Sequence, residues 1–167
     1  MSDQTAPSTT KQASPAGMKD QGLQMGQAHE FLILLPLKEG GAARMREKAK
    51  TFGDSIKSID KIATVHDFRY AIFDNDTRLL FASTYDGGFE QYIKDFATLI
   101  PDQIDEFFGE SEGYPGVRHP EIWSFIAKYQ LQALVFYSAY PDVPVRQVWK
   151  GQRVLKAFED LLDQAQS

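Results

Sequence analysis

Apolar residues follow two kinds of pattern along this chain, continuous runs and helical stripes. The run from Phe31 to Leu35 is long enough for a strand and too short for a typical helix, which predicts a strand covered on both faces. A stripe spaced by four and three residues between Met45 and Ile59 predicts an amphipathic helix. A second stripe, from Phe89 to Ile100, predicts another helix that is interrupted at Pro101.

Between these helices the pattern is that of a β-hairpin. Residues Val65–Phe73 and Arg78–Tyr85 are rich in β-branched and aromatic side chains, and Asp74–Thr77 has the composition of a turn. If Asn75 and Asp76 form the turn, Phe73 lies opposite Arg78 and the other pairs follow by counting back along both strands.

The last third of the chain predicts further helices and one more strand. Its elements are a helical turn or two over residues 104–108, a Gly- and Pro-rich loop over 109–120, a helix start at Pro120, a strand over Leu131–Tyr140 and a closing helix that carries Val148, Leu155, Phe158 and Leu162.

The order of these elements contains β-α-β twice around a central hairpin, which is the ferredoxin-like βαββαβ arrangement. We therefore predict one α+β domain over residues 29–167, with an antiparallel sheet and additional helices. Residues 1–28 lack aromatic side chains and hold few branched aliphatic ones, so we predict a disordered tail there.

A sheet with helices on one side is expected to alternate apolar and polar residues, but these strands do not. Phe31 to Leu35 is apolar on both faces, and residues 79–82 and 133–137 are nearly so. Either the additional helices or a second copy of the chain must cover the second face. A second copy, paired sheet to sheet, would form a closed dimeric barrel.

Composition limits the classes of function. With 167 residues, 43% of them hydrophobic, the chain is long enough for one domain with a real core. The net charge of −5 argues against a broad nucleic-acid surface, and the absence of cysteine excludes disulfides and thiolate chemistry. The longest apolar stretch is too short to span a membrane and no secretory signal is apparent, so we expect a cytoplasmic protein.

The predicted hairpin register places an aromatic face with several polar groups on one side of the two strands, the usual composition of a small-ligand pocket. His66 is a candidate general base or proton shuttle on this face. The alternative is a packed aromatic core or a dimer interface. The candidate ligand-binding residues on this face are Phe68, Tyr70, Phe81, Ser83 and Tyr85.

Two further candidates lie on the opposite face of the hairpin. Arg69 needs an acceptor, which is either Asp67 or Asp86 in a structural ion pair or the carboxylate of a bound ligand. Asp86 precedes two glycines and a helix, so it is either the N-cap of that helix or a catalytic carboxylate. No metal site is expected, because the three histidines lack the spacing of metal ligands.

Over residues 29–140 the order of elements and the two-faced apolar strands resemble the dimeric α+β barrel superfamily. The segments His66–Arg69, Leu79–Gly87 and Phe89–Ile93 are similar to a segment of assorted bacterial proteins with this type of fold. The superfamily includes small monooxygenases, haem-handling enzymes, dye-decolourising-type peroxidases and proteins of no known activity. The resemblance thus implies a homodimer and, in its enzymatic members, an oxidoreductase with or without haem.

Two functions follow from these observations. One is a dimeric protein that binds, and as an enzyme would oxidise, a small aromatic or hydrophobic compound. The other is a non-catalytic interaction or accessory protein that dimerises through its sheet.

Overall fold

The computed structural model describes residues 22–165, apart from the side chains of residues 54–57. Its centre is one antiparallel sheet with the strand order β1-β2-β4-β3, and β5 pairs with the same edge of β2 as β1 does. The predicted α+β class is confirmed. The strands are β1 (Gln24–Met25), β2 (Ala28–Pro36), β3 (Val65–Phe73), β4 (Arg78–Asp86) and β5 (Gln130–Leu131).

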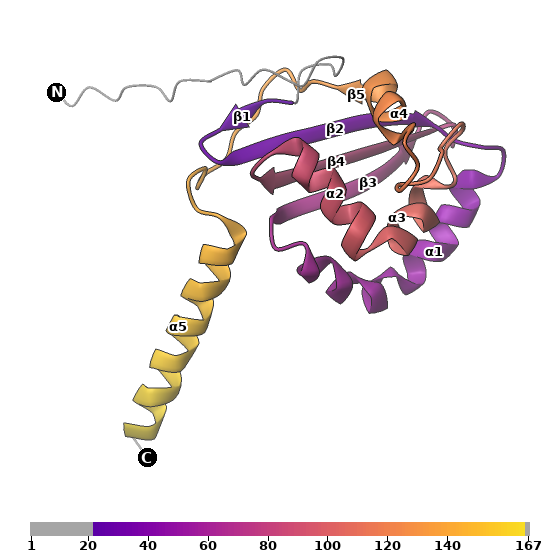
Figure 1. Cartoon of the computed structure of the whole chain (residues 1–167). Helices are drawn as coiled ribbons and strands as arrows, with labels where there is room; N and C mark the ends of the chain where they lie inside the picture. Colours follow the sequence, from indigo (N-terminus) through magenta and orange to yellow (C-terminus); the bar gives the residue numbers. More distant parts are fainter. Residues whose placement is uncertain (1–21, 166–167) are drawn as a thin grey trace.

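Helices lie on one side of this sheet, and the core lies between the two layers (Figure 1). The apolar stripes of α2 and α3 face the sheet, so Phe96 and Phe108 from these helices join Phe31 and Phe81 from the strands in a single buried cluster. The helices of this layer are α1 (Gly41–Ser55), the 3₁₀ helix η1 (Ile56–Lys61), α2 (Phe89–Leu99), α3 (Pro101–Phe108) and α4 (Ile122–Tyr129).

The register of the β3–β4 hairpin agrees with the prediction over residues 67–73 and fails at His66. Asp74, Asn75 and Asp76 all have positive φ angles in the turn, and Phe73 lies opposite Arg78 as predicted. Near the start of β3 the register shifts, so that Val65 and not His66 lies opposite Tyr85. This irregularity is a β-bulge, which removes His66 from the face that carries Phe68.

The predicted strand over Leu131–Tyr140 is wrong beyond its first residue. β5 ends at Leu131, and the following residues run without strand pairing to α5, with Leu134 98% exposed. An extended β5 would have to pair in turn with residues 31, 30, 29 and 28 of β2, but β1 already pairs with His29 and Ala28. The edge of β2 that a longer β5 could use is therefore short.

β1 lies inside the segment that the sequence predicts to be a tail. Its two residues pair with the start of β2, which itself begins at Ala28, so the ordered part of the chain begins before residue 29. The rest of the predicted tail, residues 1–21, lies outside the described residues.

The closing helix α5 (Val145–Ala165) forms as predicted but projects away from the rest of the molecule (Figure 1). Val145 is its only buried residue. Within residues 22–165 no helix, α5 included, combines the length and the apolar character needed to cross a membrane.

Candidate functional site

The structure divides the predicted site residues between the two faces of the sheet. Phe68, Tyr70, Phe81, Ser83 and Tyr85 share the face that the helices cover, as predicted, and there they pack into the core or against it. The sheet separates these five residues from Arg69 and Asp86, which lie on its other face. The bulge separates them from His66. The eight residues therefore do not form one pocket.

A buried polar group lies within the aromatic packing of the covered face. The hydroxyls of Ser83 and Tyr92 form a 2.6 Å hydrogen bond, and the Tyr92 ring stacks on Tyr85 with 4.0 Å between ring centroids. Burial raises the pKa of both tyrosines, so both hydroxyls stay protonated at neutral pH. Ser83 thus has a protein partner of its own, as expected for a hydroxyl in the interior.

Beside this group lies His29, which the sequence analysis did not select. Its ring stacks against Tyr85 at 5.5 Å, and its Nδ1 lies 3.1 Å from the Gln27 carbonyl oxygen. Nδ1 is then the N–H donor, which leaves Nε2 as an acceptor in the neutral ring. Neither Nε2 of His29 nor the hydroxyl of Tyr85 has a hydrogen-bond partner among the described residues.

Burial lowers the pKa of His29, although the Gln27 carbonyl and the charge of Asp86 oppose the shift. The ring is therefore a neutral, buried base at physiological pH. The sequence does contain a signal for the burial of His29. Side chains two residues apart point to the same face of a strand, so His29 lies on the face of β2 that carries the core residues Phe31 and Ile33.

Asp86 joins β3, β4 and the start of α5. One carboxylate oxygen lies 2.6 Å from Nε2 of His66, and the other accepts a 2.8 Å hydrogen bond from the backbone N–H of Val145. The predicted N-cap role at α2 is wrong, because Gly88 is the N-cap there and no side chain caps that end. Asp86 instead satisfies the first N–H of α5, a helix that begins 59 residues later in the chain.

Arg69 forms an ion pair with Asp67 at 2.5 Å on the face away from the helices, with both side chains at least half exposed. The structural alternative for Arg69 is thus the one observed. An exposed pair of this kind contributes about 0.2–1 kcal/mol or less to stability.

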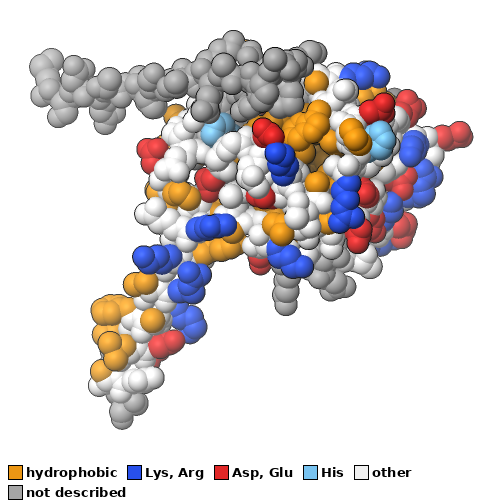
Figure 2. Space-filling model, viewed as in Figure 1, with side chains coloured by type: hydrophobic (Ala, Val, Ile, Leu, Met, Phe, Trp, Pro, Cys, Tyr) orange, Lys and Arg blue, Asp and Glu red, His pale blue; other side chains and the backbone are white. Residues whose placement is uncertain are grey.

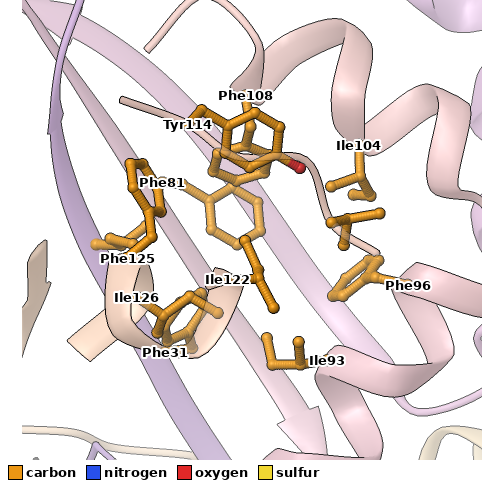
Figure 3. A pocket seen from close by; sticks show the side chains of 12 residues that line it. Phe31, Phe81, Ile93, Phe96, Ile104, Phe108, Tyr114, Ile122, Phe125 and Ile126 are labelled. Atoms are coloured by element: carbon orange, nitrogen blue, oxygen red, sulfur yellow. The ribbon is translucent and has the colours of Figure 1, made fainter. Parts of the chain in front are cut away.

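Two small cavities lie in the core on either side of Phe81. The larger, about 40 Å³, lies between the sheet and helices α2 to α4 and is lined by apolar side chains and Tyr114 (Figure 3). The smaller, about 20 Å³, adjoins Phe68 and Tyr70. Pockets for drug-sized ligands are roughly 300–1,000 Å³, and an apolar cavity that binds benzene is about 150 Å³.

These dimensions bear on the haem that the family resemblance implies. Neither cavity could hold a haem, and the polar contact recorded for His66 Nε2 is Asp86. No group of three or more His, Asp or Glu among residues 22–165 is arranged to hold a metal ion. The described residues of this region therefore do not fit a haem site.

The second candidate site is a surface. The face of the sheet away from the helices, here called the uncovered face, consists mainly of apolar side chains, and none of them belongs to the buried core cluster. Phe73 and Leu131 on this face are each 42% exposed. The apolar residues of the uncovered face are Leu32, Leu34, Ala71, Phe73, Leu80, Ala82 and Leu131, and polar residues such as Arg69 and Thr84 lie on the same face.

Comparison of the chain with protein families, with curated proteins and with solved structures finds no match.

Proposed function

We propose that this protein is a non-catalytic interaction protein that acts as a homodimer, with the uncovered face of each sheet packed against that of a second copy. The observation that carries the proposal is the uncovered face itself. Leu34 and Leu80 lie side by side at its centre, and no helix of the described chain packs on them. Leu34 and Leu80 are partly exposed and Phe73 is exposed, and soluble monomers seldom leave a large continuous apolar surface open to water.

The strand order supports the ferredoxin-like arrangement that such a dimer requires. Counting only the four strands of the βαββαβ unit, the sheet runs β5-β2-β4-β3, with the two central strands nine residues long. A two-fold axis through the uncovered face would bring the same residues of both copies together, as in the commonest class of homodimer. This geometry corresponds to a closed dimeric barrel.

Polar residues border the apolar centre in the way an interface requires. Arg69 and Asp67 form their exposed ion pair on β3, at one edge of the sheet. At the other edge the Glu30 carboxylate is buried and accepts hydrogen bonds from the backbone N–H groups of Leu23 and Ala133. The polar side chains that border the apolar centre therefore have hydrogen-bond or ion-pair partners, as at the rim of a typical interface.

A matched pair of substitutions tests this proposal. Phe73 on the uncovered face is 42% exposed and Leu99, at the end of α2 in the helix layer, is 40% exposed. We expect the wild type to be a dimer by light scattering, Phe73→Glu to dissociate at least tenfold more readily, and Leu99→Glu to remain dimeric. Leu34→Glu, at the centre of the face, is expected to give a monomer.

Circular dichroism of each variant separates loss of dimerisation from loss of folding. A wild type that is monomeric at all concentrations would refute the proposal. So would equal behaviour of Phe73→Glu and Leu99→Glu.

A second candidate function, binding of a small aromatic compound, is favoured by one observation. Nε2 of His29 and the hydroxyl of Tyr85 are buried side by side without partners among the described residues, and such groups usually have one. Neither cavity described above is lined by His29 or Tyr85, so a small ligand with one hydrogen-bonding group would satisfy them only by displacing neighbouring side chains. Oxidation of such a compound by this protein stays a prediction.

Phenol is a suitable probe for this second function. Millimolar phenol is expected to raise the melting temperature of the wild type, and His29→Phe, which keeps an aromatic ring against Tyr85, is expected to lose this response. Cyclohexane-like probes without a hydroxyl serve as the control. An unchanged melting temperature of the wild type would remove this candidate.

A further inference from the structure

Helix α5 carries an apolar stripe that the rest of its own chain leaves exposed. Phe158 is 57% exposed and Leu155 is 58% exposed, although both are large and apolar. Figure 2 shows apolar side chains gathered along one side of this projecting helix and basic ones along the other. The stripe, here called the α5 stripe, consists of Val148, Val154, Leu155, Phe158, Leu161 and Leu162.

The spacing within the α5 stripe is that of a helix that pairs with another helix. Val148, Leu155 and Leu162 are seven residues apart, and Phe158 follows Leu155 by three and precedes Leu162 by four. These are the a and d positions of a heptad, whose side chains form the seam of a coiled coil. Val154 and Leu161 widen the seam on one flank, while the charged residues of α5 lie on the remaining surface.

The charges of α5 indicate the orientation of its partner. The first twelve residues carry only basic charges and the last seven only acidic ones. This order is the reverse of what the macrodipole of a single helix favours, because positive charge is unfavourable near an N-terminus and negative charge near a C-terminus. The basic residues are Arg146, Lys150, Arg153 and Lys156, and the acidic ones are Glu159, Asp160 and Asp163.

Two copies of α5 resolve this conflict only when they run antiparallel. The basic half of each helix then lies level with the acidic half of the other, and the two macrodipoles also oppose one another favourably. A parallel pair would place basic beside basic and acidic beside acidic, at a cost. The self-complementary charge order thus favours a second copy of this chain over an unrelated partner.

The position of α5 allows such pairing beside the uncovered face. The carboxylate of Asp86 accepts a hydrogen bond from the first N–H of α5. Asp86 lies four residues after Ala82 on β4, so both side chains point to the uncovered face. Since Val145 is buried and the helix leaves the domain there, the α5 stripe begins next to the surface proposed above for dimerisation.

We propose that the α5 helices of two copies pair antiparallel through the α5 stripe, with Leu155 of each level with Phe158 of the other. The proposal shares with the proposed function only the identity of the partner, a second copy, and it assigns a different surface. Burial of large apolar side chains is the main favourable term in protein association, so the α5 stripe can supply a large share of the association free energy.

Distances between spin labels test the orientation directly, because the chain contains no cysteine of its own. Lys150→Cys and Asp163→Cys place one label near each end of the helix, on its polar side. Thirteen residues of α-helix span about 20 Å along the axis. In an antiparallel pair, a mixture of the two labelled proteins gives a short 150–163 distance, and each protein alone gives a distance longer by about 10–20 Å.

Short distances in each singly labelled protein and a long one in the mixture would show a parallel pair and overturn the proposal. Absence of any intermolecular distance below about 60 Å, at concentrations where the wild type is dimeric, would show that α5 does not pair and would equally overturn it.

Neighbouring substitutions separate this proposal from the sheet interface. Leu155→Gln lies in the α5 stripe and Lys156→Gln lies on the polar side of the same turn. We expect Leu155→Gln to weaken dimerisation at least tenfold and Lys156→Gln to change it less than threefold. If Leu155→Gln has no effect while Phe73→Glu gives a monomer, the α5 proposal fails and the sheet interface stands; the opposite result rejects the sheet interface and keeps α5.

Discussion

The covered face of the sheet and the α5 stripe have similar side chains and opposite environments. On the covered face, Phe81 is 3% exposed and its ring contacts Phe31, Phe68, Tyr70 and Phe108. On α5, Phe158 carries the same ring and is 57% exposed. The covered face is stabilised by its own chain, whereas the α5 stripe lacks a partner within the described residues.

The difference shows that an apolar pattern in the sequence predicts that a surface is buried but does not predict which segment or molecule buries it. Both regions have the helical or strand periodicity that indicates burial. Only the first finds its partner within one chain. The following experiments test whether the two regions differ energetically as they differ structurally.

The largest expected effect is that of Phe81→Ala. Removal of the ring from the centre of the aromatic packing is expected to lower the free energy of unfolding by about 3–5 kcal/mol, measured by urea denaturation. Phe158→Ala, the matched change on α5, is expected to cost less than about 0.5 kcal/mol at protein concentrations where the wild type is monomeric. Its cost should grow with concentration, because the dimer then contributes to stability.

Phe81→Leu provides the same comparison should the alanine variant fail to fold. Equal losses for the Phe81 and Phe158 variants at low concentration would contradict the contrast between the two regions.

An intermediate loss of stability is expected at Asp86, where the sheet is joined to the start of α5. Asp86→Ala removes both the contact with His66 and the hydrogen bond to Val145, and we expect a loss of about 1–2 kcal/mol, measured by urea denaturation. His66→Ala removes only the first contact and should cost less. Hydrogen exchange at the Val145 amide is expected to accelerate in Asp86→Ala and to stay unchanged in His66→Ala; acceleration in both would show that Asp86 acts through His66.

The smallest expected effect is a pH dependence that arises from His29. Burial lowers the folded-state pKa of this ring below 6.5, so the unfolded state binds more protons in the window between the two values. The free energy of unfolding is therefore expected to fall as the pH is lowered from 7.5 through 6.5 towards the folded-state pKa. His29→Phe should flatten this part of the curve.

The exposed His119 provides the control for that measurement. His119→Gln is expected to retain the pH dependence of the wild type. If His119→Gln flattened the curve and His29→Phe did not, the assignment to His29 would be wrong.

Periodicity and turn chemistry predicted the local elements well, since these depend on neighbouring residues. The α+β class and the pairing of residues 67–73 with 78–84 are confirmed. The helix predicted from Met45 to Ile59 forms only in part, because α1 ends at Ser55 and the chain continues as the 3₁₀ helix η1. A hairpin register needs only the position of its turn, and Asn75 and Asp76 mark that turn.

The errors lie where one segment depends on another that is distant in sequence. The predicted strand over Leu131–Tyr140 has the right composition, but β1 takes the edge that it would need. The pairing of His66 fails at a bulge that no turn signal marks. Asp86 caps a helix, as its residue type suggests, but the helix is α5 and not the adjacent α2.

By itself, then, the sequence determined most of the long helices and strands and which of their faces are apolar, because period and turn residues act over a few neighbouring positions. Tertiary structure alone decided which distant side chains meet: the ring of His29 stacks on Tyr85, Ser83 bonds Tyr92, and Asp86 bonds the start of α5. It also decided which apolar faces the described chain covers and which it leaves exposed. These outcomes depend on which of β1 and β5 pairs with each part of the free edge of β2, and on which face of the sheet the helices cover. Both are determined only when segments distant in sequence pack together.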